Sequence, residues 1–144
     1  FDFTRLVEDR LAAFDDLFAQ KELTLEKSLL PETYLLGDTQ LLQKAIDNLI
    51  HNAITYSPVQ NKIAVCLWIE QNKVCFSMEN TGTHIPDEVI PKLFEPFYRV
   101  DTSRNRRTGG SGLGLYIVKT ILDLHGAGIE IVNTLQGVLV KVSF

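Results

Sequence analysis

The chain has 144 residues, of which 45% are hydrophobic and 22% charged, with a net charge of -4 at pH 7. This length fits one domain over residues 1–144, and the apolar fraction excludes a disordered chain. The negative charge gives no general attraction to polyanions, so we expect no nucleic-acid partner. The longest apolar runs are far shorter than the ~20 residues that cross a bilayer. We therefore expect a globular domain, monomeric when isolated.

Two cysteines, Cys66 and Cys75, lie in alternating apolar segments without the spacing of a redox or zinc motif. Reduced, buried thiols are favoured over a disulfide, and they are typical of a cytoplasmic compartment. The chain begins with Phe1 instead of Met and ends at the apolar Phe144. We expect it to be one domain of a longer polypeptide.

In chain order, the first predicted element is an amphipathic helix over residues 3–20, because apolar side chains recur on one helical stripe. Residues 22–26 alternate between polar and apolar side chains, which predicts a half-buried strand. Pro31 then turns the chain into a second short strand, expected near residues 33–36.

A long helix is predicted next, over residues 39–56, with Asp38 as its N-cap and Pro58 ending it. A hairpin follows. Residues 63–69 and 74–78 both alternate, and a polar turn separates them.

The last predicted elements are a helix over residues 112–125 that ends at Gly126, and strands at 129–132 and 138–142. Residues 80–111 form a long segment with little regular structure, and such segments in a compact domain are usually functional. Helices and antiparallel strands occur in separate groups. This order favours a two-layer α+β sandwich with the three main helices on one face of a mixed, mostly antiparallel sheet.

The first candidate functional feature is the pair Asn48 and Asn52, which are four residues apart and so share one helix face beside Thr55. Asparagine is a poor helix former, which makes this pair unusual for an ordinary solvated surface. An amide oxygen is a suitable ligand for Mg²⁺, which keeps most of its waters. A functional site is favoured over a solvated helix surface.

The second feature is the loop 80–86 directly after a strand. Gly82 would let a ligand ring approach the backbone closely, and Asn80 offers an acceptor and two donors, enough to bind an adenine edge. Taken alone, the segment is simply a loop with one glycine.

The third feature is a glycine-rich segment, 108–115, that leads into the last helix. Closely spaced glycines at a helix N-terminus expose N–H groups to an anion, and the helix dipole favours negative charge there. Four arginines lie just upstream, although the protein is acidic overall. The segment is predicted to bind phosphate, and it is not a P-loop because no Lys-Ser/Thr follows the glycines.

The three features in this order, with a Phe-Glu-Pro-Phe segment at 94–97, resemble the catalytic ATP-binding domain of bacterial sensor histidine kinases. That domain belongs to the GHKL superfamily, which includes gyrase-type, Hsp90-type and mismatch-repair ATPases. Residues 48–52 match its N box, 80–86 its first Gly-rich box, 94–97 its F box and 110–114 its second Gly-rich box.

The resemblance implies a Bergerat-type fold that holds Mg²⁺ and ATP under a mobile lid at about 98–111. It also implies transfer of the γ-phosphoryl group to a histidine on a separate dimerisation domain, signalling to a response regulator, and a full-length protein anchored in the cell membrane. Asn52 is the implied metal ligand. The implied ATP-binding residues are Asn48, Asn52, Tyr56, Asn80, Gly82, Ile85, Phe97, Arg99, Arg104, Gly110, Ser111, Gly112, Leu113 and Gly114.

The chain departs from the family pattern in several places, and the last Gly-rich box is retained only as Gly137, with Val138 where a Thr is common. Asn80 replaces the usual Asp of the first Gly-rich box, His84 replaces its second Gly, and Thr55 stands where many relatives have a phosphate-contacting Lys. The amide oxygen of Asn80 can still accept a hydrogen bond from the adenine amine. These departures also leave open a degenerate module that serves only for binding.

None of the three histidines, His51, His84 and His125, is followed by the acidic residue and Pro typical of the family's acceptor helix. The chain is therefore expected to contain no catalytic acceptor, and the acceptor and sensor domains are expected upstream. A second alternative is an ATP hydrolase of the gyrase or chaperone type. Those enzymes place a Glu four residues before the metal ligand, where this chain has Asn48, which cannot act as a base.

Overall fold

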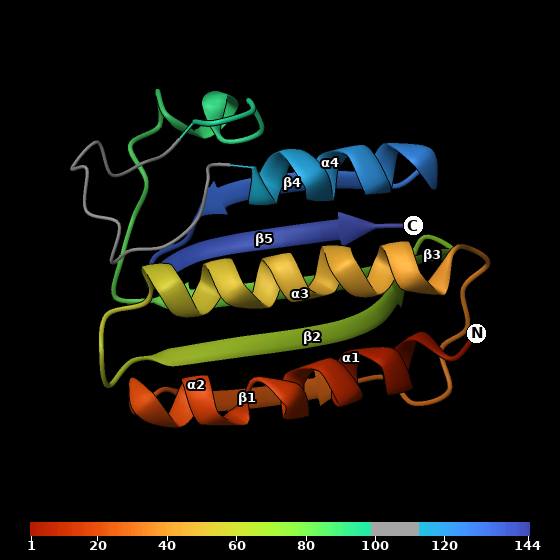
Figure 1. Cartoon of the computed structure of the whole chain (residues 1–144), viewed down its shortest axis with the longest axis horizontal. Coiled ribbons are helices and arrows are strands. Elements are labelled where there is room, and N and C mark those ends of the chain that lie inside the picture. Colours follow the sequence, from red (N-terminus) through yellow and green to blue (C-terminus); the bar gives the residue numbers. More distant parts are fainter. Residues whose placement is uncertain (99–112) are drawn as a thin grey trace.

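The computed structural model describes residues 1–98 and 113–144. A five-stranded sheet forms one layer and the helices cover one of its faces, which confirms the predicted α+β sandwich (Figure 1). The elements in chain order are α1 (Phe3–Ala13), α2 (Asp15–Gln20), β1 (Thr24–Leu29), α3 (Thr39–Tyr56), β2 (Lys62–Glu70), β3 (Lys73–Thr81), the 3₁₀ helix η1 (Ile90–Lys92), α4 (Gly114–Leu124), β4 (Gly128–Asn133) and β5 (Gly137–Ser143).

The sheet order is β1-β2-β3-β5-β4. Strands β1 and β2 are parallel and are connected through α3, whereas the other three pairs are antiparallel. The sheet is therefore mixed and mostly antiparallel, as predicted. This order places the end of β3 next to the beginning of β5, so the loop after β3 lies beside the β4–β5 turn.

Helix α3 lies between α1 and α4 on the sheet (Figure 1). The Asp38 carboxylate accepts a hydrogen bond from the Leu41 amide at 3.0 Å, which caps the helix at its predicted start. Apolar side chains at helical spacing bury one face of α3 against the sheet, including Leu42, Ile46 and Ile50. Because α3 is held along its length, its last turns are a rigid base for side chains at the open end of the sandwich.

The main core lies between the helices and the inner sheet face, where alternate residues of β2 (Ile63, Val65 and Leu67) are buried. A smaller cluster of Leu93, Ile131 and Val138 lies apart from this core. It connects η1 to strands β4 and β5, and so anchors the segment after β3 to the sheet.

Two predicted elements differ from the structure. The helix expected over residues 3–20 is broken at Phe14 into α1 and α2, and the two aspartates that begin α2 favour a new helix N-terminus there. The strand expected near 33–36 is a single bridge between Asp2 and Tyr34. Pairing stops there because the neighbouring N-terminal segment turns into helix α1 at Phe3.

Both cysteines are free thiols, Cys75 buried and Cys66 half-buried, in agreement with the predicted reduced state. Within the part of the chain that the structure describes, no helix is both long and apolar enough to span a bilayer.

Candidate functional site

The C-terminal half of α3 carries Asn48, Asn52 and Tyr56 on successive turns of one face. The Asn48 amide donates to the Lys44 carbonyl at 2.9 Å, whereas the Asn52 side chain makes no hydrogen bond to a described residue. Asn52 is therefore free to bind a ligand, and part of the Asn48 side chain is already engaged within the helix.

The end of α3 is held by Lys21, whose ammonium group donates to the carbonyls of Ile54, Thr55 and Ser57 at 2.7, 3.0 and 2.9 Å. Burial lowers the pKa of Lys21 below its ordinary value, and the three carbonyl oxygens replace lost water around the charge. A cation at a helix C-terminus also interacts favourably with the helix dipole. Lys21 thus fixes the turn that carries Tyr56.

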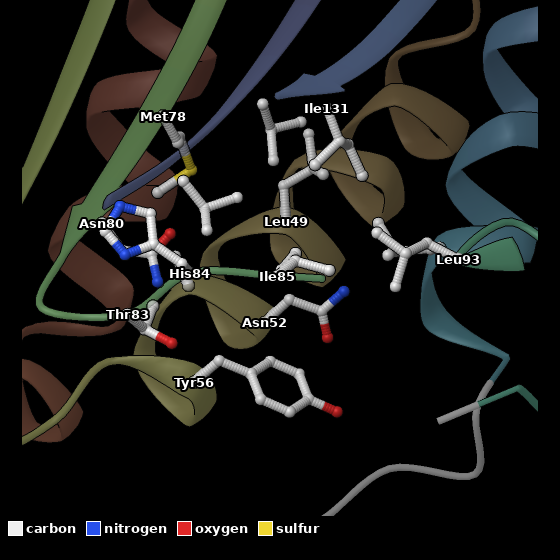
Figure 2. A pocket seen from close by; sticks show the side chains of 14 residues that line it. Leu49, Asn52, Tyr56, Met78, Asn80, Thr83, His84, Ile85, Leu93 and Ile131 are labelled. Atoms are coloured by element: carbon white, nitrogen blue, oxygen red, sulfur yellow. The ribbon is translucent and has the colours of Figure 1, made fainter. Parts of the chain in front are cut away.

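A mainly apolar pocket opens between α3, the sheet and the loop after β3 (Figure 2). Figure 2 shows Asn80 and His84 on one side of this pocket and Leu93 on the other, with Asn52 and Tyr56 projecting from α3. The lining residues are Leu49, Asn52, Ala53, Tyr56, Met78, Asn80, Thr83, His84, Ile85, Leu93, Leu115, Ile131, Val138 and Val140.

Asn80 is a polar residue on the inner face of β3, where its neighbours are apolar, and it is only 7% exposed. Its side chain makes no hydrogen bond to a described residue. Since no described side-chain N or O atom that is sealed from solvent lacks a hydrogen-bond partner, the Asn80 amide is open to the pocket, where a ligand or water can bind to it. Asn80 is the most distinctive polar group of the pocket.

The loop after β3 begins with a tight turn at Gly82, whose φ is +83°. A Cβ at this position would lie 2.5 Å from the Asn61 Oδ1 atom, so only glycine fits here without rearrangement. The Gly82 amide donates to the Gln136 carbonyl at 3.1 Å, which connects the loop to the β4–β5 turn.

Asn133, at the end of β4, holds the same loop through a pair of hydrogen bonds. Its Oδ1 accepts from the Ile85 amide at 2.8 Å, and its Nδ2 donates to the Ile85 carbonyl at 2.6 Å. His84 Nε2 donates to the Thr134 carbonyl at 2.9 Å. Asn133 could not be identified from the sequence, because no local pattern indicates a contact with a residue 48 positions earlier.

Gly114 begins α4 directly beside the two asparagines of α3. A Cβ on Gly114 would lie 3.4 Å from Asn48 Oδ1 and 3.6 Å from the Asn52 amide atoms. Any larger side chain at this position would crowd the space in front of Asn52. Leu113 precedes the helix, and within the described residues no side chain caps the first amides of α4, which can therefore donate to an anionic or carbonyl partner.

The structure brings several predicted site residues together and leaves others apart. Asn52, Tyr56, Asn80 and Ile85 line the pocket, and Asn48, Leu113 and Gly114 lie at its α3–α4 edge. Gly82 shapes the loop but does not line the pocket, and Phe97 is 71% exposed and outside it. The predicted residues that lie outside the described part of the chain are Arg99, Arg104, Gly110, Ser111 and Gly112.

The polar groups of the pocket are amides, hydroxyls and one imidazole. Among residues 1–98 and 113–144, no group of three or more His, Cys, Asp or Glu side chains could enclose a metal ion. Asn52 offers one amide oxygen, which suits a cation that keeps several waters and takes its other ligands from phosphate.

Residues 37–144 match the family described as "Histidine kinase-, DNA gyrase B-, and HSP90-like ATPase". The sensor protein VanSB of Enterococcus faecalis is 36% identical over 140 residues, which cover 96% of this chain and 31% of VanSB. The sensor histidine kinase CusS of Escherichia coli K12 is 41% identical over 101 residues, covering 70% of this chain and 21% of CusS. This chain therefore spans less than a third of either relative.

Solved structures share the fold. The nucleotide-free catalytic domain of the histidine kinase ThkA is 26% identical with a TM-score of 0.88, covering 100% of this chain and 94% of that one. A structure of ThkA in complex with the response regulator protein TrrA has a TM-score of 0.83 at 24% identity, covering 100% and 40% of the two chains.

Proposed function

Because the chain belongs to the histidine kinase-, DNA gyrase B- and HSP90-like ATPase family, we propose that it binds Mg²⁺ and ATP as the catalytic domain of a sensor histidine kinase. The domain would donate the γ-phosphoryl group of ATP to a histidine on a separate dimerisation domain. The P–O bond to the leaving ADP breaks and a P–N bond to the acceptor imidazole forms.

The observation that carries this proposal is the Asn80 amide in an apolar pocket, where no described residue forms a hydrogen bond with it. Purine bases are flat and mostly apolar, with hydrogen-bonding groups at the ring edge. Side chains such as Met78, Leu93 and Ile131 suit the ring faces, and Asn80 suits the edge. A base in this pocket would fix the nucleotide at one end.

The residues present also fit Mg²⁺. Asn52 would hold it through Oδ1, with water and phosphate oxygens completing the coordination shell. When bound, the cation neutralises charge that develops on the transferring phosphoryl group. The protein's own contribution is positioning, since α3 holds Asn52 rigidly and Gly114 keeps the space in front of it open.

The proposed partners follow from the relatives of this chain, since VanSB is named a sensor protein and CusS a sensor histidine kinase. They are a dimerisation domain of the same polypeptide and a response regulator, the class of protein found with ThkA. We also propose that this domain is cytoplasmic and that the full-length protein is anchored in the cell membrane.

An ATP hydrolase is the main alternative, and Asn48 argues against it. An amide cannot accept a proton from water, and this one already donates to the Lys44 carbonyl. A module that binds without transferring phosphate is the other alternative, and its best support remains the three departures at Thr55, Asn80 and His84.

Calorimetric titration of ATP with and without Mg²⁺ tests the proposal. We expect Asn52→Ala to abolish the Mg²⁺-dependent part of the affinity while the fold, followed by circular dichroism, persists. His51→Ala is the matched control, since His51 is exposed on the same helix and does not line the pocket. Unchanged Mg²⁺ dependence in Asn52→Ala would show that the metal assignment is wrong.

A further inference from the structure

The side chain of Asn80 has a fixed position but no fixed orientation of its amide. Its backbone is held in the middle of the sheet, paired with Ile63 on β2 and Val138 on β5. In the described part of the chain, every side-chain N or O atom that is sealed from solvent has a hydrogen-bond partner. The Asn80 amide has none there, so its atoms are open to the pocket.

An asparagine amide presents an acceptor at one end and two donors at the other, and rotation about its last side-chain bond exchanges them. Hydrogen bonds to neighbouring groups normally decide which end faces a ligand. Since no described neighbour fixes Asn80, the ligand itself selects the orientation. The oxygen can accept from a 6-amino group, and the NH₂ group can donate to a 6-oxo group.

The other described residues of the pocket do not restrict the orientation of the Asn80 amide. Among the described lining residues there is no aspartate or glutamate whose carboxylate would face a carbonyl oxygen on the base. The hydroxyls of Tyr56 and Thr83 can donate or accept. His84 Nε2 donates to the Thr134 carbonyl, so this nitrogen is already engaged within the protein.

We propose that Asn80 is a specificity-determining residue that lets this pocket bind 6-oxo purine nucleoside triphosphates as well as ATP. The inference rests on the proposed nucleotide function and names the substrate class of the same pocket. A carboxylate at position 80 would accept from a 6-amino group but would face a 6-oxo oxygen with like charge, so the permissiveness depends on the amide.

The test compares ATP with inosine triphosphate, which has a 6-oxo group and an N1–H where ATP has a 6-amino group and an N1 acceptor, and which carries no 2-amino group. Both dissociation constants are measured by calorimetry with Mg²⁺ for the wild type and for Asn80→Asp. We expect the wild type to bind the two nucleotides within about tenfold of each other. We expect Asn80→Asp to raise the dissociation constant for inosine triphosphate relative to that for ATP by about tenfold or more, since a carboxylate that faces the 6-oxo oxygen has no hydrogen to donate to it.

The outcomes separate this inference from the function on which it rests. If the wild type binds ATP and its dissociation constant for inosine triphosphate is about a hundredfold higher or more, the inference is wrong and the proposed function stands. If neither nucleotide binds, both fail. GTP is measured as a third nucleotide. If inosine triphosphate binds and GTP does not, the role of Asn80 is supported and the 2-amino group is what excludes GTP. The ratio of the wild-type dissociation constants for inosine triphosphate and ATP tests the inference even if Asn80→Asp does not fold.

Discussion

The main chain of Gly137 on β5 lies directly against the carbonyl oxygen of Asn80 on β3. A Cβ at Gly137 would come within 1.9 Å of that oxygen, closer than any real contact. Gly137 is paired with Thr81, one residue beyond Asn80, so this contact lies at the end of β3 beside the pocket. The position of Asn80 thus depends on a residue 57 positions later that has no side chain.

Gly137→Ala should therefore displace β3 at Asn80 and weaken both the fold and the pocket. Overpacking of this kind costs about 1–3 kcal/mol of the free energy of unfolding. Urea denaturation and ATP titration would measure the two effects. Gly128→Ala is the matched control, because Gly128 is also a strand glycine and a Cβ there would meet nothing within 4 Å. Equal losses in both variants would mean that strand propensity, and not the contact with Asn80, is responsible.

Asn133→Ala should loosen the loop that carries Ile85. The variant leaves the amide and carbonyl of Ile85 without their partners, a loss of about 1–3 kcal/mol in the stability of this loop. We expect faster amide hydrogen exchange at Ile85 and weaker ATP binding, with little change in exchange at Val65 in the core. Gln136→Ala, at an exposed side chain in the same turn, is the control. Unchanged exchange at Ile85 would contradict the role given to Asn133.

Lys21→Met should fray the end of α3. The three carbonyls of Ile54, Thr55 and Ser57 would lose their charged donor, at a cost of about 1–3 kcal/mol. Because Tyr56 lies in this turn and lines the pocket, the affinity for ATP should fall as well. Lys44→Met serves as the comparison, since Lys44 is exposed on the same helix. A Lys21→Met protein as stable as Lys44→Met would exclude the capping role.

The isolated domain should hydrolyse ATP very slowly and should not label itself with γ-labelled ATP. Both ring nitrogens of His125 are engaged, Nδ1 donating to the Ile121 carbonyl at 2.8 Å and Nε2 accepting from the Asp38 amide at 3.0 Å. His84 Nε2 is held by Thr134. Labelled protein should appear only when the acceptor-helix domain is supplied, because attachment raises its effective concentration to the millimolar range.

Released phosphate and acid-labile protein label would be followed together in that experiment. Rapid hydrolysis by the domain alone would favour the chaperone-type alternative. Label on His51, His84 or His125 would show that the acceptor lies in this chain after all.

Local sequence patterns were sufficient to predict those helices and strands whose bounds depend on their own residues. The helix over residues 39–56 was predicted with its observed ends, because Asp38 caps it and its apolar stripe is regular. The hairpin of β2 and β3 followed from alternation on both sides of a polar turn. Asn52 could be proposed as a ligand-binding residue because two asparagines on one helix stripe are unusual. Asn80 was expected in a loop after a strand and was proposed for its acceptor and donors, whereas the structure places it within β3.

Long-range contacts decided the rest, and no local pattern encodes them. The helix break at Phe14 and the single bridge at Tyr34 depend on how the N-terminal segment packs against its neighbours. No local pattern predicts that Gly137 contacts Asn80 or that Asn133 contacts Ile85. The pairing of β3, β4 and β5 creates both contacts. The sequence alone was enough to propose which side chains could bind a nucleotide. The tertiary structure decided which of them face one pocket, because that depends on strand register and on contacts between residues about 50 positions apart.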